Sequence, residues 1–348
     1  MLPYSKTTMQ YRIAVLGCGH IGRKHAALAA RYGKLVGVAD RDQEKATAIA
    51  QLYQVSAYSN LTELLAQAEP EIVVICTPNG LHAQHSLEAL RSNALVLCEK
   101  PMALNSKDAA EMIQTARLFN KRLFVVKQNR FNPPVAWVKQ LLEQQQLGNL
   151  VGFQLNAFWN RDPAYFRQSA WRGSLNLDGG PLFTQFSHFV DLLYWYLGPL
   201  KEVKFATAEN WLHPDCIEFE DQGMVVLEFE CGISGSVQYS LNAHKKNMEG
   251  SITLFGEKGT VKIGGSYLNE IAYCNIEGVE VPTFPVLESN QYGTYEGSSS
   301  QHHLVYEAML KALENPANRF LGPEEALQSV AIIEAIYAKM GNRRKEHE

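Results

Sequence analysis

The sequence predicts an α/β chain with two domains: a doubly wound parallel sheet, then an α+β domain on a mostly antiparallel open sheet. The chain has 348 residues, more than one domain usually holds, and 46% of them are hydrophobic against 20% charged. Its first part alternates short apolar runs with helical patterns, whereas strand-like runs follow one another after residue 150. We place the domains at residues 10–130 and 131–340.

The first domain is expected to contain five parallel strands. Short, nearly continuous apolar runs are typical of strands buried on both faces of a parallel sheet, and they occur at 13–16, 35–39, 72–76, 95–98 and 123–126. Helical patterns separate them, among others at 46–53, 61–68 and 108–119. This alternation predicts the doubly wound arrangement.

The second domain begins where the rhythm changes, near Asn132-Pro133-Pro134. One helix is expected to about residue 146, followed by strands that include 225–230, 234–241, 251–255 and 260–263. Helical patterns at 302–314 and 323–340 close the chain, and the charged segment 342–348 is expected to fray. An open sheet needs cover for its exposed face, so we expect a homodimer or homotetramer packed sheet to sheet.

Composition excludes several classes of partner. Lys and Arg number 32 against 36 Asp and Glu, a net charge of −4, so nucleic acid is not an expected partner. The chain has no apolar run long enough to span a bilayer and no apolar core in its first ten residues, which predicts a soluble, cytoplasmic protein. Its six cysteines lack metal-ligand spacing, so we expect reduced thiols and no metal.

The strongest local motif is a glycine-rich turn between the run at 13–16 and a helical pattern, Gly17-Cys18-Gly19-His20-Ile21-Gly22. Glycines at these positions permit a tight turn, a close approach of backbone to a pyrophosphate, and close packing of helix on strand. The start of the helix supplies oriented N–H donors to the phosphates. The motif therefore predicts a dinucleotide site in a Rossmann-like domain.

Polar residues follow the next strands of the same sheet. Asp40 lies eighteen positions after Gly22, where a carboxylate accepts from the adenosine ribose hydroxyls. A carboxylate repels a 2′-phosphate and favours NAD over NADP, although the adjacent Arg41 could hold that phosphate. The segments Thr77-Pro78-Asn79 and Glu99-Lys100-Pro101 each end a buried strand, the edge at which ligand chemistry belongs.

These motifs together resemble the Gfo/Idh/MocA oxidoreductases. The resemblance rests on the glycine-rich turn, on Cys76-Thr77-Pro78-Asn79-Gly80-Leu81-His82, on Glu99-Lys100-Pro101, on Trp171-Arg172-Gly173, and on Gly179-Gly180 leading to His188 and Asp191. Their order and spacing match over nearly the whole chain. The resemblance implies an NAD-dependent sugar dehydrogenase with a Rossmann domain.

Within that family the chain resembles most the UDP-N-acetylglucosaminuronate 3-dehydrogenases of the WlbA/WbpB type. The similar stretches are Arg130-Phe131-Asn132-Pro133, Trp159-Asn160-Arg161 with Tyr165, Trp171-Arg172-Gly173, and Gln185-Phe186-Ser187-His188. This implies oxidation of the sugar C3 hydroxyl in the biosynthesis of bacterial surface polysaccharides. By the resemblance, the cofactor is lined by Gly17, Gly19, His20, Ile21, Asp40, Arg41, Thr77, Pro78, Asn79, His82, Glu99, Lys100, Gln128, Trp171 and Arg172.

Hydride transfer from a secondary alcohol needs a base for the hydroxyl proton and a donor for the developing alkoxide. Lys100 and His188 are the predicted catalytic pair. We assign His188 as general acid/base and Lys100 as the orienting donor that shares the proton, although a coupled pair need not keep distinct roles. Asp191 would share the His188 helix face and orient the imidazole; alternatively, it stabilises the helix start through the dipole.

The position four residues before His188 separates this chain from relatives that act on polyols and simple sugars. Those usually carry Asp there, and this chain has Thr184, which removes a carboxylate and argues against an inositol or simple aldose substrate. A UDP-sugar acid instead needs arginine for its pyrophosphate and carboxylate, and aromatic rings for uracil. We expect the substrate to contact Lys100, Arg130, Asn132, Arg161, Tyr165, Thr184, Gln185 and His188.

Other candidates are expected to be structural. His302 and His303 are adjacent, diverge on a helix, and are expected to be solvated or to start that helix. Glu218, Glu220 and Asp221 are expected to be a solvated acidic loop. Two other functions stay open: an NAD(P)-dependent dehydrogenase or reductase of a free sugar, polyol or other small molecule, and a non-catalytic NAD(P)-sensing regulator.

Overall fold

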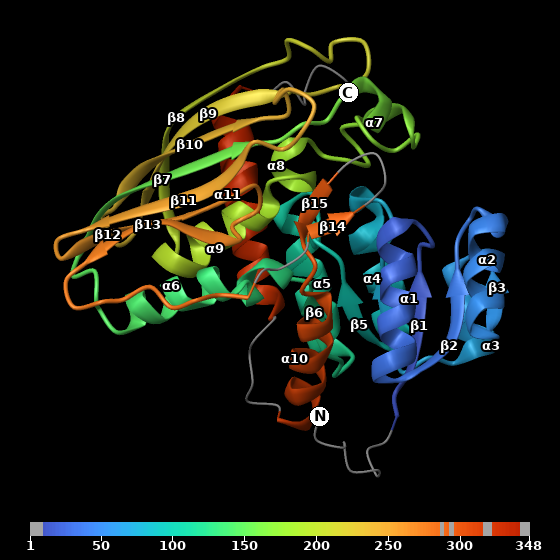
Figure 1. The fold of residues 1–348 in the computed structure, drawn as a ribbon. Coiled ribbons are helices and arrows are strands. Elements are labelled where there is room, and N and C mark those ends of the chain that lie inside the picture. The colour runs from blue at the N-terminus through green and yellow to red at the C-terminus, as the bar shows by residue number, and fades with distance from the viewer. Residues whose placement is uncertain (1–9, 286–288, 292–295, 316–321, 342–348) are drawn as a thin grey trace.

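The computed structural model describes residues 10–285, 289–291, 296–315 and 322–341, and Figure 1 shows its two sheets and their helices. The first sheet is parallel, in the order β3-β2-β1-β4-β5-β6. Its strands are β1 Arg12–Leu16, β2 Lys34–Ala39, β3 Ser56–Tyr58, β4 Ile72–Ile75, β5 Leu95–Cys98 and β6 Leu123–Val125. The five predicted strands are confirmed, and β3 is an additional short edge strand.

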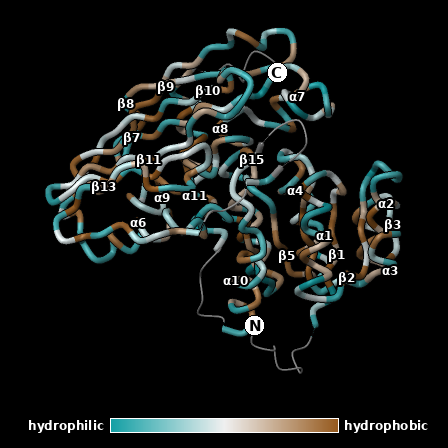
Figure 2. Tube along the Cα trace, viewed as in Figure 1, coloured by the Kyte–Doolittle hydropathy of each residue, from teal (hydrophilic) through white to brown (hydrophobic). Residues whose placement is uncertain are grey.

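Helices cover both faces of this sheet, as the doubly wound prediction requires. They are α1 His20–Tyr32, α2 Gln43–Tyr53, α3 Leu61–Ala68, α4 His82–Arg91 and α5 Ser106–Leu118, with 3₁₀ turns at Asn79–Leu81 and Gln128–Phe131. The side chains of Asp42, Asn60 and Asn105 cap α2, α3 and α5 by accepting from backbone N–H groups of the first turn. The central strands are hydrophobic along their length (Figure 2), because both of their faces are buried.

The second sheet has the order β13-β12-β11-β7-β10-β9-β8. Its strands are β7 Leu150–Phe158, β8 Leu200–Glu209, β9 Gln222–Phe229, β10 Ser234–Ser240, β11 Glu249–Gly256, β12 Gly259–Gly264 and β13 Glu270–Ile276. All neighbouring pairs are antiparallel except β7 with β10, which confirms the mostly antiparallel prediction.

Helices pack against one face of the second sheet (Figure 1). They include α6 Pro133–Glu143, α8 Pro181–Thr184, α9 Ser187–Leu197 and α11 Pro323–Lys339, while α7 Pro163–Arg167 lies near one end of the sheet. The inner face is apolar: the rings of Phe186 and Tyr239 lie 5.7 Å apart. On the opposite face Gln154 and Gln238 are exposed, and no described helix covers them.

The chain returns to the first domain near its end. After the hairpin of β14 Ser289–Gln291 and β15 Glu296–Ser299, α10 His302–Glu314 packs with α1 against the parallel sheet. Val305, Tyr306 and Met309 share a buried cluster with Ile13 and Val15. The segment 131–340 thus contributes one helix to the first domain, and the boundary at residue 130 stays a prediction. The helices predicted at 302–314 and 323–340 are confirmed, and the tail 342–348 lies outside the described residues.

The six cysteines form no disulfide with one another, and Cys18, Cys76 and Cys98 are buried. In the described parts of the chain, every helix is too short or too polar to cross a membrane.

Candidate active site

The glycine-rich loop at the start of α1 has the shape that a pyrophosphate needs. Gly17 has φ +94°, and a Cβ there would lie 2.5 Å from the Cys76 carbonyl oxygen. A Cβ on Gly22 would lie 1.7 Å from the Gly17 carbonyl oxygen, whereas one on Gly19 would meet nothing within 4 Å. Gly17 and Gly22 therefore shape the turn, and Gly19 leaves open space before a helix start that has no side-chain cap.

Asp40 lies at the end of β2 beside this loop. Its Oδ2 accepts from Cys18 N at 2.6 Å, and its Oδ1 accepts from Asp42 N at 2.8 Å. The carboxylate is partly exposed, as a group that reads ribose hydroxyls must be, and Arg41 next to it is exposed. The loop and this carboxylate together fit an adenosine diphosphate group.

The loop after β4 is fixed by two buried side chains. Asn79 Nδ2 donates to the Asp178 carbonyl oxygen at 2.8 Å and to Thr184 Oγ1 at 2.7 Å, which links the two domains. The two ring nitrogens of His82 lie 2.6 Å from Pro101 O and 2.7 Å from Thr77 O. His82 is 1% exposed and both of its ring nitrogens have backbone partners. It therefore connects two strand ends, contrary to the prediction that it lines the cofactor.

Lys100 projects from the end of β5 toward the second domain. Its Nζ donates to the Thr184 carbonyl oxygen at 2.6 Å. Burial lowers the pKa of Lys100 to about 8, while the carboxylates of Glu99 and Asp178 oppose that shift. Lys100 is therefore a donor whose proton is held weakly enough to be shared near neutral pH.

His188, near the start of α9, lines the same cavity as Lys100. Burial and the nearby Lys100 ammonium keep the pKa of His188 well below its ordinary value, so its imidazole is neutral at neutral pH. Gln128 Nε2 lies 3.2 Å from His188 Nε2 and donates to it, which makes Nε2 the acceptor nitrogen. Ser298 of β15 lies 3.4 Å from the same nitrogen. A neutral imidazole with this acceptor is a suitable general base.

Asp178 is a site residue that the sequence analysis missed. It is fully buried, Thr184 Oγ1 donates to its carboxylate, and Gly173 N donates to its Oδ2 at 3.0 Å. Burial raises the pKa of Asp178 to about 6. Thr184 stands where polyol-oxidising relatives usually carry an Asp, and Asp178, six residues earlier in the chain, places a carboxylate next to the Thr184 hydroxyl instead. Its position just before Gly179-Gly180 was the available signal.

Arginines and aromatic rings gather beside Lys100, as the expected substrate chemistry requires. The Arg172 guanidinium lies 4.1 Å from the Tyr165 ring centre, and that of Arg161 lies 5.1 Å from both the Tyr165 and Trp159 rings. Gln185 Nε2 donates to the Tyr165 hydroxyl at 3.2 Å. Trp171 and Arg172 are partly exposed. Burial and then the Arg172 charge lower the pKa of His20, which places this loop beside the glycine-rich turn.

Two of the predicted substrate residues have internal partners instead. Arg130 is 2% exposed and forms a bidentate ion pair with Asp191, at 2.7 and 2.8 Å, and a second pair with Glu325. Asn132 is fully buried and donates to the carbonyl oxygens of Tyr267 and Leu268 at 3.3 Å. Neither is available to a substrate anion, so both predictions are wrong in this geometry.

Asp191 has neither of its two predicted roles. Its carboxylate binds Arg130 and lies 3.3 Å from Lys127 Nζ, and these cations hold its pKa far below the ordinary value. Ser329 of α11 also donates to it at 3.1 Å. Asp191 is therefore the centre of a buried ion-pair cluster behind His188, not an orienting partner of the imidazole or a dipole stabiliser.

Two groups expected to be solvated are buried. Asp221 is 0% exposed and lies 3.0 Å from His213 Nδ1, and Glu220 accepts from the Tyr239 hydroxyl at 2.9 Å; of the predicted acidic loop, Glu218 alone is exposed. His302 does start α10, but it is 1% exposed and lies 3.5 Å from Glu99. Glu99 is also buried, and its two carboxylate oxygens contact His25 and the backbone N–H of Lys100. The prediction that Glu99 lines the cofactor is therefore not met by this side chain.

Comparison with known proteins gives the same two parts. The NAD-binding Rossmann-fold model of the Gfo/Idh/MocA oxidoreductase family matches residues 11–127, and the C-terminal domain model of this family matches residues 135–262. Curated relatives include the glucose-6-phosphate 3-dehydrogenase of Bacillus subtilis, 30% identical over 53% of each chain. The D-glucoside 3-dehydrogenase of Escherichia coli is 28% identical over 67% of this chain and 68% of its own.

Solved structures extend the similarity to nearly the whole chain. The WlbA dehydrogenase from Bordetella pertussis, in complex with NADH and UDP-GlcNAcA, is 32% identical with a TM-score of 0.85, over 95% of this chain and 96% of its own. A levoglucosan dehydrogenase in complex with NADH shares the fold, with a TM-score of 0.81 at 20% identity. The chain therefore belongs to the Gfo/Idh/MocA oxidoreductase family and is an NAD-dependent dehydrogenase of the sugar type.

Proposed function

We propose that this dehydrogenase oxidises a nucleotide sugar at a secondary hydroxyl, namely C3 of UDP-N-acetylglucosaminuronate (UDP-GlcNAcA), in bacterial surface-polysaccharide biosynthesis. The observation that carries the proposal is the similarity, over nearly the whole chain, to a dehydrogenase solved with NADH and UDP-GlcNAcA. Two further relatives are named as 3-dehydrogenases of glucose derivatives, which supports oxidation at C3.

The first domain supplies the groups that would hold NAD. Gly17, Gly19, His20 and Ile21 fit the pyrophosphate, and Asp40 fits the adenosine ribose, with Arg41 beside it. The nicotinamide half would lie against the strand ends and the facing loop, near Thr77, Pro78, Asn79, Lys100, Gln128, Trp171 and Arg172. When bound, NAD supplies the hydride acceptor for the carbinol carbon.

The second domain supplies the groups for a charged sugar nucleotide. Arg161 and Arg172 flank the Tyr165 ring. Arg172 is partly exposed, and its planar guanidinium group suits the pyrophosphate or carboxylate of UDP-GlcNAcA. Arg161 is 3% exposed and donates to Asn160 O and Asn247 Oδ1. Thr184 and Gln185 connect this group to Lys100 and Asp178 through hydrogen bonds.

The environments of His188 and Lys100 divide the proton chemistry between them. His188 is neutral at pH 7 and therefore able to accept the proton of the C3 hydroxyl. Lys100, with a pKa of about 8, is mostly an ammonium at that pH and donates to the developing alkoxide oxygen. Lys100→Met should abolish turnover and leave NAD binding largely intact, because most NAD contacts come from other residues. Lys107→Met, on the exposed side of α5, is the matched control.

The test of the proposed function is absorbance at the reduced-nicotinamide band. Purified protein and NAD are mixed with UDP-GlcNAcA, UDP-N-acetylglucosamine or myo-inositol, each with and without 2-oxoglutarate. Reduction of NAD with UDP-GlcNAcA, and with neither of the other two substrates, supports the proposal. Reduction with myo-inositol only would reassign the enzyme to free polyols, and no reduction by any of the three would remove the nucleotide-sugar assignment. The 2-oxoglutarate arms reveal NADH that is reoxidised in place.

A further inference from the structure

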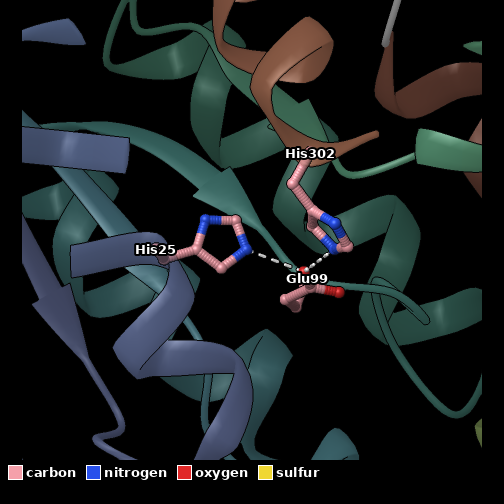
Figure 3. A group of neighbouring side chains, drawn as sticks. All are labelled: His25, Glu99 and His302. Atoms are coloured by element: carbon pink, nitrogen blue, oxygen red, sulfur yellow. Dashed lines mark hydrogen bonds and ion pairs between the residues drawn. The ribbon is translucent and has the colours of Figure 1, made fainter. Parts of the chain in front are cut away.

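A buried cluster of two histidines and one carboxylate lies next to the catalytic lysine in sequence and outside the chemistry described above. Figure 3 shows His25, Glu99 and His302 converging from α1, the end of β5 and the start of α10. His25 Nε2 lies 2.8 Å from Glu99 Oε1, and His302 Nε2 lies 3.5 Å from the same oxygen. The three side chains are almost completely buried.

The remaining contacts of Glu99 and His25 connect the cluster to the backbone of Lys100 on one side and to Tyr306 on the other. Glu99 Oε2 accepts from the backbone N–H of Lys100 at 3.0 Å. His25 Nε2–H donates to the Glu99 carboxylate, and on the far side His25 Nδ1 lies 3.0 Å from the Tyr306 hydroxyl. The carboxylate thus bridges two imidazoles from one side and the backbone of Lys100 from the other.

Two imidazoles and a carboxylate are also a ligand set for a divalent cation. The surroundings favour hydrogen bonding instead. The His25–Glu99 distance is that of a hydrogen bond, and the charged groups that face Glu99 include the ammonium groups of Lys24 and Lys100. The other titratable groups that sense this carboxylate are Cys76, His82, Cys98, His188 and Tyr306. A dication beside two ammonium groups would be repelled, whereas one ionised carboxylate is attracted by both.

We propose that His25 and His302 are positioning residues for Lys100: by holding the Glu99 carboxylate between them, they fix the backbone and the charge environment from which Lys100 acts. The inference rests on the proposed role of Lys100. The proposal also assigns a role to α10. This helix packs on the first domain and places His302 next to Glu99 at the end of β5.

The charge of Glu99 reaches Lys100 directly. Burial lowers the pKa of Lys100 to about 8, and the Glu99 carboxylate is the largest influence that opposes this fall. The two histidines keep Glu99 ionised despite its burial. Removing either histidine should therefore leave Glu99 less completely ionised and less firmly placed, and lower the pKa of Lys100 further.

The experiment measures Lys100 in the NAD-free protein. Lysines are reductively methylated with ¹³C, the Lys100 signal is assigned by its absence in Lys100→Arg, and its pKa is read from the chemical shift against pH. We compare His25→Phe, His302→Phe and Glu99→Gln with His303→Phe, which alters the next residue of the same helix. The milder His25→Gln keeps a donor. NAD affinity and the pH profile of turnover are recorded for each folded variant.

We expect the pKa of Lys100 to fall by about one unit or more in His25→Phe, His302→Phe and Glu99→Gln. It should change little in His303→Phe, with partial rescue in His25→Gln. The alkaline limb of the turnover profile should move by the same amount. An unchanged Lys100 titration in folded His25→Phe, His302→Phe and Glu99→Gln would overturn the inference. So would one equivalent of zinc in purified protein that is lost in His25→Gln. Because the titration needs no substrate, failure of the nucleotide-sugar assay leaves this result readable.

Discussion

At the residue scale, the proposed proton transfer depends on buried ionisable side chains and on the groups that face them. Lys100 and His188 were predicted from the resemblance to the family, and Lys100 also from its position after a buried strand; the structure places both on one cavity. Asp178 was not predicted, because its role depends on a contact with Thr184 that forms when the Gly179-Gly180 turn brings the two together. Arg130 was misassigned for a related reason: sequence shows that an arginine is present but not that Asp191 faces it.

Asp178→Asn tests whether this hidden carboxylate tunes the site. We expect turnover to fall about tenfold, because Thr184 loses a charged partner and Lys100 loses a nearby negative charge. An ionisation near pH 6 should also disappear from the pH profile. The measurement is kcat against pH for both proteins. A profile of unchanged shape would show that Asp178 has no part in the chemistry.

The raised pKa of Asp178 also fixes the sign of a stability change. Folding favours the protonated form, so this group weakens the fold as the pH rises from about 4 through 6. The stability advantage of the wild type over Asp178→Asn should therefore shrink by roughly 2 kcal/mol between pH 4 and pH 8. Urea unfolding at the two pH values measures it, and an advantage that grows with pH would contradict this account.

Arg130→Gln should act on stability and not on substrate binding. The change leaves Asp191 with one fewer cationic partner in a buried site, so we expect the free energy of unfolding to fall by about 3 kcal/mol. The KM for the nucleotide sugar should stay within about twofold, a change of only a few tenths of a kcal/mol. Arg167→Gln, at an exposed position, is the control for both measurements. A large rise in KM without loss of stability would restore Arg130 as a substrate residue.

At the element scale, strands buried on both faces were predicted closely, because every position of such a strand is apolar. The edge strand β3 is three residues long and half-buried, so it carries no continuous apolar run, and it was missed. The glycine-rich loop was predicted because each glycine has its own steric reason. In the structure a Cβ on Gly17 or Gly22 would clash with a backbone carbonyl, whereas one on Gly19 would enter open space. The buried acidic pair Glu220 and Asp221 was misread, because its burial depends on contacts with His213 and Tyr239 that the charge pattern does not show.

Gly19→Ala and Gly22→Ala form a matched pair within that loop. A methyl group on Gly19 enters open space, so the fold should be unchanged while NAD binds about tenfold more weakly, as expected for lost backbone approach to a phosphate. On Gly22 the methyl group meets the Gly17 carbonyl oxygen, so we expect a loss of roughly 1 to 3 kcal/mol of stability. Calorimetric titration with NAD and thermal unfolding distinguish the two. Equal NAD affinity in Gly19→Ala and the wild type would remove this loop as the phosphate site.

At the scale of the whole molecule, the chain order does not follow the domains. Helix α10 was predicted from its periodicity, but the local pattern held no information that it would pack on α1 and carry His302 to Glu99. The second sheet has one helix-covered face and one face with exposed Gln154 and Gln238. Its predicted role in assembly therefore depends on a second copy of the chain.

We expect light scattering to give two or four times the chain mass of 39.0 kDa. Placing lysines at Gln154 and Gln238 should dissociate the assembly, because like charges would meet across a sheet-to-sheet contact. Gln146→Lys, exposed just beyond α6, serves as the control. A monomeric wild type at micromolar concentration would contradict the prediction.

The measurement that tests the central claim most directly follows the hydrogen itself. UDP-N-acetylglucosaminuronate carrying deuterium at C3 is incubated with the protein and NAD, and the reduced cofactor is analysed by mass spectrometry. We expect the wild type and Lys107→Met to form reduced cofactor that carries the deuterium, and Lys100→Met to form no reduced cofactor. Unlabelled NADH would place the oxidation at another carbon. Labelled cofactor formed by Lys100→Met at the wild-type rate would show that Lys100 is not the group on which the chemistry depends.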